Sequence, residues 1–374
     1  MNNSICLVMM VKNEATTLKR AVESCRPFVD GVLISVDSNS EDGTLEIAKE
    51  IADFVLQHDF ETEDTPHGSF AKCRNHIIQG ALENSFGWAI QLDGHEYICP
   101  KGKDTFKSLI EENPKCDAFS FGLNMNGTIV RQVRMHRTLE TIRYNGDIHN
   151  VLSGYKNEKY NTTIEFFHDR ADQPGEYIKQ RDIQRKEMSL KILGEKIEKN
   201  PKDARAMFYL AQSLKETGKI KKAIELFERY LTVSNFQAEK WNACKYMYDC
   251  WMSLNNKEKA LAAIHRGLKE QERAEGYVIL GNAEYDNKNY EIALELYKKA
   301  SETKRPNFAV FISEDDYTWI PHDKMSMCYH NLKKYLEAIE EAALSIKNKP
   351  RERQLKRIAD NIGFWVKYIR EGST

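Results

Sequence analysis

The 374-residue sequence lacks two features that would mark a membrane or exported protein. No apolar run approaches the ~20 residues that a membrane-spanning helix needs. The apolar stretch near the start, Ile5 to Val11, is closed by Lys12, Asn13 and Glu14, which is too early for a signal peptide. We therefore expect a soluble protein of the cytoplasm.

The sequence also lacks paired cysteines and an excess of charge of one sign. Its eight cysteines contain no C-x-x-C pair, and several lie in apolar stretches, so we expect reduced core thiols. Lys and Arg (55) nearly balance Asp and Glu (56), and the resulting weak overall field favours neither nucleic acid nor an anionic membrane as partner. Modified DNA is accordingly a less favoured partner.

What the first half does contain is a regular alternation of short apolar runs and helical patterns. The runs of strand length are Ile5 to Val11, Gly31 to Val36, Asp53 to Gln57 and Trp88 to Leu92. The helical patterns between them cover Ala15 to Ser24, Thr44 to Ala52 and Phe70 to Asn84. This alternation predicts an α/β domain with a mostly parallel sheet covered on both faces. Strands over Cys116 to Met125 and Thr128 to Arg137 should extend the sheet.

Polar clusters follow three of the predicted strands. They are Lys12 to Glu14, Asp37 to Thr44, and Asp93 to Glu96. In a parallel sheet, ligands bind where the loops at the carboxyl ends of the strands converge. The three clusters therefore predict one site, and the stretch "LDGHE" (Leu92 to Glu96) supplies groups that bind metals.

Four motifs in order along the chain carry a resemblance to a known family. They are "VMMVKNEATTLKRAVES", "VDSNSEDGTLEIA", "FAKCRNHII" and "WAIQLDGHEYI". Over roughly residues 4 to 170 the sequence resembles the family 2 glycosyltransferases, which have the GT-A fold. The resemblance is strongest to the branch that carries tetratricopeptide repeats and includes peptide S-glycosyltransferases. It implies transfer of a sugar from a nucleotide sugar, with a UDP-sugar expected.

The resemblance also implies a metal site. The family usually has Asp-x-Asp where this sequence has Asp93-Gly94-His95, and polypeptide N-acetylgalactosaminyltransferases similarly have Asp-x-His. Mn²⁺ accepts carboxylate and imidazole ligands together, whereas Mg²⁺ prefers oxygen, so Mn²⁺ is expected over Mg²⁺. The alternative is that His95 only hydrogen-bonds a neighbour. His149 resembles the further metal or diphosphate ligand, with His168 as the competing candidate.

Other positions should contact the nucleotide. A carboxylate can accept from a base N–H, short polar side chains can bind the nucleoside, and a guanidinium suits a diphosphate. The expected contacts are Glu14, Asp37, Asn39, Ser40, Lys72, Arg74 and Asp93. For Lys72, a charge on a solvent-facing helix is the alternative. Inverting transfer also needs a general base, and the candidates are Asp147 and Glu96.

Beyond residue 173 the pattern becomes helical and repetitive. Ala223, Ala260, Ala293 and Ala338 occupy equivalent places, 37, 33 and 45 residues apart, around the tetratricopeptide period of ~34. The long third gap holds the segment 301–323, which should loop out. We predict a glycosyltransferase domain over 1–172, a linker helix over 173–202 and repeats over 203–374 that end in a capping helix.

The sequence thus predicts a metal-dependent, inverting glycosyltransferase that acts on a peptide, protein or glycan. Its repeats should select the acceptor or a protein partner, since solenoids present a concave binding surface. Alternatively, the repeats stabilise the catalytic domain or form a dimer. Two other hypotheses are a repeat-based adaptor with an inactive catalytic half and a nucleotidyltransferase, which would release pyrophosphate.

Overall fold

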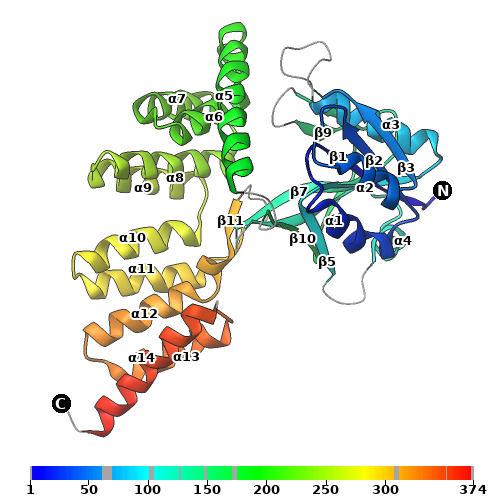
Figure 1. Cartoon of the computed structure of the whole chain (residues 1–374). Coiled ribbons are helices and arrows are strands. Elements are labelled where there is room, and N and C mark those ends of the chain that lie inside the picture. Colours follow the sequence, from blue (N-terminus) through cyan, green and yellow to red (C-terminus); the bar gives the residue numbers. More distant parts are fainter. Residues whose placement is uncertain are drawn as a thin grey trace. The chain divides into compact units, whose positions relative to one another are not determined.

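The chain forms two compact units, Met1–Lys199 and Asn200–Thr374 (Figure 1). The computed structural model describes residues 2–60, 70–100, 105–125, 128–146, 150–170, 175–306, 311–350 and 352–371. A long helix, α5 (Gly175–Lys199), lies in the range expected for the linker and is grouped with the first unit.

The first unit is built on a mixed sheet. Eight strands of this unit follow one another in it in the order β3-β2-β1-β4-β7-β6-β10-β5. Their bounds are β1 (Ile5–Val11), β2 (Gly31–Asp37), β3 (Phe54–His58), β4 (Trp88–Asp93), β5 (Glu96–Pro100), β6 (Ala118–Met125), β7 (Thr128–Arg137) and β10 (Glu158–His168). A separate two-stranded sheet pairs β8 (Arg143–Asn145) with β9 (Val151–Ser153).

The parallel part of the sheet explains why the predicted loops meet. Strand β1 pairs in parallel with β2 on one side and with β4 on the other, and β2 continues to β3. The register places Val11 beside Val36 and Met10 beside Asp93, so three strands end at one edge. Strand β7 then runs antiparallel to β4 and β6, which confirms that the later strands extend the sheet.

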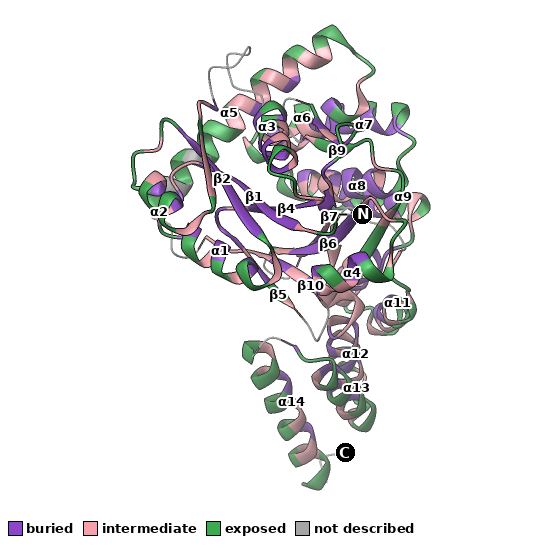
Figure 2. Cartoon of the chain, turned by 90° about the vertical axis from the view of Figure 1, so that its right-hand side faces the viewer, coloured by how far each residue is buried: buried purple, intermediate pink, exposed green. Residues whose placement is uncertain are grey.

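Helices cover the sheet because its strands are apolar on both faces. Helix α3 (Phe70–Glu83) packs on β1, β2 and β4, while α1 (Leu18–Cys25) lies on the other side (Figures 1 and 2). The other helices of this part are α2 (Thr44–Ile51) and α4 (Phe106–Glu112), with the short 3-10 helix η1 (Arg26–Phe28). Figure 2 shows β1, β2 and β4 as almost wholly buried, which confirms a sheet covered on both faces.

The second unit is a series of antiparallel helix pairs, which confirms the predicted solenoid. The pairs are α6 (Ala204–Glu216) with α7 (Ile220–Val233), α8 (Gln237–Ser253) with α9 (Lys257–Glu270), α10 (Ala274–Asp286) with α11 (Tyr290–Glu302), and α12 (Ile320–Asn331) with α13 (Tyr335–Lys347). Helix α14 (Glu352–Arg370) follows as the last helix, where the cap was expected. The four marker alanines lie on α7, α9, α11 and α13 and are all fully buried.

The segment 301–323 departs from expectation. Its described second half does not simply loop out, because it forms the short strand β11 (Phe311–Ser313), the 3-10 helix η2 (Glu314–Tyr317) and the start of α12. Trp319, at the head of α12, packs into a core with Ala338, Ala342 and Trp365. The insertion is thus part of the fold.

Two further expectations concern the whole chain. In the part that the structure describes, every helix is too short or too polar to cross a bilayer. All eight cysteines are free thiols, and six of them are buried. Burial raises the pKa of the Cys6 and Cys244 thiols to about 12, so these groups stay protonated and behave as core side chains.

Candidate functional site

The loops after β1 and β2 are joined by hydrogen bonds into one structure. The Glu14 backbone N–H donates to Thr44 Oγ1 at 2.8 Å, and the Ala15 N–H donates to Asp42 Oδ2 at 2.9 Å. In return, the Asn13 side chain accepts from the Glu41 N–H at 2.9 Å. Asn13 itself has a left-handed backbone with φ of 53°, a conformation that asparagine tolerates better than most residues. These bonds fix the direction in which Glu14 enters the site.

His95 is held between a carboxylate and a guanidinium. Its Nδ1 lies 3.1 Å from Glu14 Oε1, and its Nε2 lies 3.1 Å from the Arg170 guanidinium. Because Arg170 can only donate, Nε2 accepts from it, and the proton on Nδ1 is then donated to Glu14. The ring is only 4% exposed, and the His168 ring meets it edge-on at 4.6 Å. His95 therefore presents its Nε2 lone pair in a single orientation.

Gly94 allows this contact because it leaves room for Glu14. A Cβ atom at position 94 would lie 2.8 Å from Glu14 Cγ and 3.1 Å from Val11 Cγ1. These distances are too short for an undisturbed side chain, so the Glu14 stem would have to move. The turn between β4 and β5 is thereby packed directly on the loop after β1.

Asp93 faces the more open side of the site together with Arg74. Its carboxylate is about one-third exposed, and Oδ1 lies 3.6 Å from the Arg74 guanidinium. Arg74 comes from α3, hydrogen-bonds the Asn150 side chain and lies 5.2 Å above the Tyr144 ring. The Tyr144 hydroxyl in turn hydrogen-bonds Gln91 on β4. Arg74 is thus fixed next to Asp93 by partners from two other segments.

Glu96 is engaged on both oxygens. Oε2 accepts the Asp93 backbone N–H at 2.9 Å, and Oε1 accepts from Arg134 at 2.7 Å. Its side chain is 1% exposed. Burial raises the pKa of the Glu96 carboxyl, while the adjacent Arg134 opposes that rise. The general-base role of Glu96 stays a prediction. Glu96 also closes the turn that presents Asp93.

The residues predicted to bind the nucleoside lie along the ends of β2 and β3. Asp37 is buried; one oxygen accepts the Asn39 backbone N–H at 2.8 Å, and the other lies 3.2 Å from Lys12 Nζ. The Asn39 side chain is exposed and donates to Asp59 at 3.2 Å. Ser40 Oγ accepts weakly from the Asn13 N–H at 3.4 Å. Lys72 is exposed on α3. Their nucleotide-binding roles stay predictions.

A divalent cation could be held at one point of this rim. Ligand atoms of Asp93, His95 and Glu96 lie within 4.8 Å of one another in the part of the chain that the structure describes. Asp93 is the most exposed of the three and pairs with Arg74 only at 3.6 Å, whereas His95 and Glu96 each have two partners. His168 lies beside them, and burial lowers the pKa of its ring to about 4, which keeps it neutral. Asp147 and His149 lie outside the described residues.

Sequence reasoning missed three residues of this site: Arg134, Arg170 and Asn150. The two arginines are separated from their partners by 38 and 75 residues. For Arg134 a signal existed, since a charged side chain in an apolar strand must find a partner when it is buried. For Arg170 and Asn150 no local pattern distinguishes them from surface residues.

Comparison with known proteins agrees with this architecture. The Glycosyl transferase family 2 model matches residues 6–165, and a tetratricopeptide-repeat model matches residues 190–238 and 252–307. No curated protein matches the chain.

Several solved structures are similar to about half of this chain. MamA is 14% identical over 47% of this chain and 89% of its own, with a TM-score of 0.36. YrrB, "a TPR protein with an unusual peptide-binding site", is 18% identical over 48% of this chain and 84% of its own, with a TM-score of 0.36. BtubC from P. vanneervenii is 15% identical over 52% of this chain and 84% of its own, with a TM-score of 0.40. The two family matches together show that the chain carries a family 2 glycosyltransferase domain followed by tetratricopeptide repeats.

Proposed function

We propose that the first unit is a metal-dependent, inverting glycosyltransferase. It would move a sugar from a nucleotide sugar, with a UDP-sugar as the expected donor, to a peptide, protein or glycan acceptor. The family match supports sugar transfer in general. The observation that carries the finer proposal is the meeting of Asp93, His95 and Arg74 at the edge where β1, β2 and β4 end.

The chemistry of these groups suits a metal and a diphosphate. When bound, a divalent cation such as Mn²⁺ would supply Lewis-acid stabilisation of the negative charge on the departing diphosphate. Asp93 and His95 would hold it, with His95 presenting Nε2 because its Nδ1–H donates a hydrogen bond to Glu14. For this, Arg170 must release Nε2. The freed guanidinium and Arg74 would then bind phosphate oxygens.

The transfer itself would be a direct displacement. A hydroxyl or thiol of the acceptor forms a bond to the anomeric carbon while the bond from that carbon to the diphosphate oxygen breaks. The proton of the acceptor passes to a general base. Asp147 and Glu96 are the candidates for this role, and both oxygens of Glu96 also hold hydrogen bonds within the protein. A thiol acceptor needs this help least, because thiols ionise near neutral pH.

The repeat unit would choose the acceptor or bind a protein partner. Solenoids of helix pairs present an extended concave surface for such binding. The division of labour predicts that donor chemistry depends on the first unit and acceptor choice on the second.

Donor hydrolysis by the purified full-length chain tests the proposal. The chain is incubated with a panel of nucleotide sugars and Mn²⁺, with Mg²⁺, or with EDTA, and the nucleotide products are separated by chromatography. We expect release of nucleoside diphosphate with at least one donor, loss of turnover in EDTA, and better recovery with Mn²⁺ than with Mg²⁺.

Each of the other outcomes would favour a different hypothesis. Undiminished turnover in EDTA would remove the metal from the proposal. Release of pyrophosphate would identify a nucleotidyltransferase. Absence of binding and hydrolysis across the whole panel would favour the repeat-based adaptor with an inactive catalytic half.

A further inference from the structure

Arg170 lies where two histidine rings of the site point to one place. Its guanidinium donates from Nη2 to His95 Nε2 at 3.1 Å and from Nε to His168 Nε2 at 3.4 Å. Because a guanidinium has no acceptor atom, both Nε2 atoms offer it a lone pair. The two rings meet edge-on with their centroids 4.6 Å apart. One cationic group is therefore held by two imidazole nitrogens, a ligand type that divalent transition metals bind.

A buried carboxylate behind His95 sets the charge that this place requires. Glu14 is 3% exposed and accepts from His95 Nδ1 at 3.1 Å and from Thr17 Oγ1 at 2.9 Å. The negative charge of Glu14 and the positive charge of Arg170 thus lie on opposite sides of one imidazole ring. Buried charges are costly unless they are paired and hydrogen-bonded. A group that replaces the guanidinium at Nε2 should therefore also be a cation.

The backbone just before Arg170 is fixed to the site. The last residues of β10 pair with β5. Asp169 donates its backbone N–H to the His95 carbonyl at 3.1 Å, and its carboxylate accepts from Arg20 of α1 at 3.0 Å. The Arg170 side chain itself is only partly buried. Its guanidinium can therefore leave His95 by rotation of side-chain bonds, without a shift of the strand.

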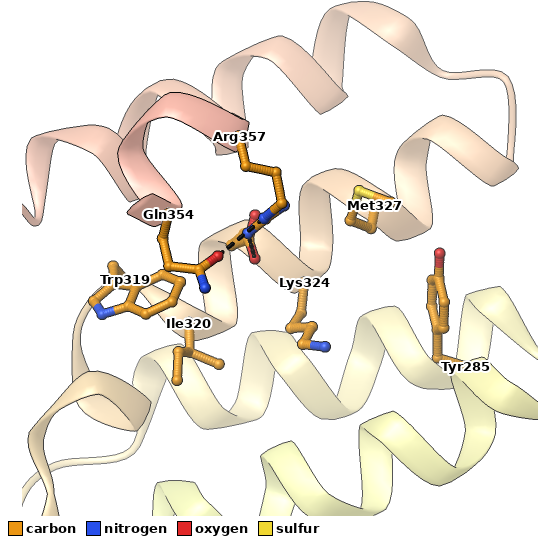
Figure 3. A pocket seen from close by; sticks show the side chains of 8 residues that line it. Tyr285, Trp319, Ile320, Lys324, Met327, Gln354 and Arg357 are labelled. Atoms are coloured by element: carbon orange, nitrogen blue, oxygen red, sulfur yellow. Dashed lines mark hydrogen bonds and ion pairs between the residues drawn. The ribbon is translucent and has the colours of Figure 1, made fainter. Parts of the chain in front are cut away.

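An arginine of the repeat unit provides a contrast. Arg357 of α14 donates to the Asp323 carboxylate at 2.7 Å and to Gln354 Oε1 at 3.0 Å (Figure 3). Both of these acceptors are oxygens, and the first carries a full negative charge. The bonds from Arg170 to His95 and His168 go to uncharged nitrogens instead. A phosphate group offers a guanidinium two charged oxygens and is a stronger acceptor than an imidazole.

We propose that Arg170 is a stand-in for the metal, which holds the Nε2 atoms of His95 and His168 until a diphosphate draws its guanidinium away. The lone pairs that Arg170 leaves are then open to the cation, and the guanidinium pairs with the diphosphate. Without a diphosphate, the cation must displace a like charge, so it binds weakly. Metal and donor binding are thereby coupled. This inference rests on the proposed function and adds to it the residue that makes metal binding depend on the donor.

The Mn²⁺ affinity of the full-length chain, measured without any nucleotide, tests the proposal most directly. Electron paramagnetic resonance of free Mn²⁺ gives this affinity for each variant. Arg170→Gln removes the competing charge and should bind Mn²⁺ about tenfold more tightly, the scale of a hydrogen bond to a charged group. Arg170→Lys keeps a charged donor and should stay within a few-fold of the wild type. Arg185→Gln, at a position of α5 that is 62% exposed, removes an equal charge and is the matched control.

Donor turnover of the same proteins should change in the opposite direction. At saturating Mn²⁺, Arg170→Gln should lower the release of nucleoside diphosphate about tenfold or more, because the departing diphosphate loses a guanidinium. Replacing a residue with only a structural role would weaken metal binding and turnover together. Tighter metal binding combined with slower turnover is therefore the result that a stand-in predicts.

Three results would overturn the inference. Arg170→Gln might bind Mn²⁺ no more tightly than the wild type, Arg185→Gln might bind it as tightly as Arg170→Gln, or turnover might be undiminished in Arg170→Gln while the wild type is active. The first result contradicts the stand-in even if the wild type transfers sugar. Conversely, tighter Mn²⁺ binding by Arg170→Gln alone supports the stand-in even if every protein fails to hydrolyse a donor, and only the proposed transfer would then be wrong.

Discussion

Charged side chains pair differently in the two units. In the first unit, Glu14 meets His95 over 81 residues, and Arg170 meets the same ring over 75. In the second unit, Lys215 pairs with Asp249 and Asp323 with Arg357, in both cases 34 residues apart. The second spacing is the repeat period itself. In a solenoid each repeat contacts its neighbours, so charges one period apart come together, whereas in the sheet the strand order decides which segments meet.

Each unit has deep and exposed pairs, but the deep ones differ in how they are joined. Arg134 and Glu96 of the first unit are 6% and 1% exposed and come from different strands, whereas Arg266 and Glu228 of the second are 40% and 49% exposed. The deep pair of the second unit, Arg273 with Glu275 at 1% and 4% exposed, joins residues only two apart. Buried charges are costly unless they are paired and hydrogen-bonded, so the meeting of buried charges from distant segments at one edge of the sheet indicates a site.

Breaking one deep pair and one surface pair tests this difference most strongly. Arg134→Met should lower the free energy of unfolding by about 3–5 kcal/mol, because it leaves the Glu96 carboxylate buried without its partner. Arg266→Met, the matched change in the solenoid, should cost less than about 1 kcal/mol. Urea unfolding followed by circular dichroism measures both. Equal losses would show that burial does not separate the two kinds of pair.

Removing the exposed carboxylate of the site tests whether the edge of the sheet carries the chemistry. Asp93→Asn should lower donor turnover by about 10²–10³, the scale for loss of one preorganised electrostatic contact. Asp249→Asn in the solenoid removes a surface carboxylate and should leave donor turnover unchanged. Steady-state release of nucleoside diphosphate is the measurement. Turnover of Asp93→Asn within a few-fold of the wild type would exclude Asp93 from the reaction.

A change at Glu14 tests whether the buried contacts at the edge of the sheet support metal binding, since this carboxylate acts through His95. Glu14→Gln keeps the shape but weakens the hold on the imidazole proton, and Mn²⁺ affinity should fall about 10–100-fold. Glu23→Gln, an exposed change on α1, is the control. Electron paramagnetic resonance of free Mn²⁺ gives the affinity without any sugar donor. An unchanged affinity would mean that Glu14 only supports the loop.

A smaller effect should appear when the pH is lowered. Burial lowers the pKa of His136 in β7 to about 4, below the ~6.5 of an exposed histidine. The folded state then binds fewer protons than the unfolded state between these values, so stability is lost as the pH falls through this range. Between pH 7 and pH 5.5 the loss should be about 1 kcal/mol.

The matched variant His136→Gln should reduce the pH dependence, because the titrating ring is gone. Thermal unfolding at the two pH values measures the difference for both proteins. Identical pH dependence in the wild type and the variant would show that His136 does not contribute.

The sequence predicts local structure well where one physical rule decides it. Apolar runs place β1, β2 and β4 within a residue of their bounds, and small residues at helix crossings identify the four buried alanines. The sequence also predicts that the polar loops meet, because neighbouring parallel strands end at the same edge of the sheet. These features depend on a period or on chain direction, both of which can be read from the sequence.

The contacts between distant segments could not be predicted in the same way. The contact of Glu14 with His95 could not be predicted, because it depends on hydrogen bonds that tie the loop after β1 to the loop after β2. The contact of Glu96 with Arg134 of β7 spans 38 residues and leaves no local pattern either. The inserted segment was expected to loop out, yet its Trp319 packs in the repeat core, because an insertion without a repeat pattern gives no sign of what it packs on.

The close packing of Gly94 on Glu14 limits how this protein can diverge. The middle position of Asp93-Gly94-His95 looks free to vary when the motif is considered alone, yet any side chain there would displace Glu14. A relative that carries alanine or serine at position 94 should therefore also have a shorter side chain at position 14 or 11. Its histidine would then need another partner on Nδ1, so these three positions should change together across the lineage rather than one at a time.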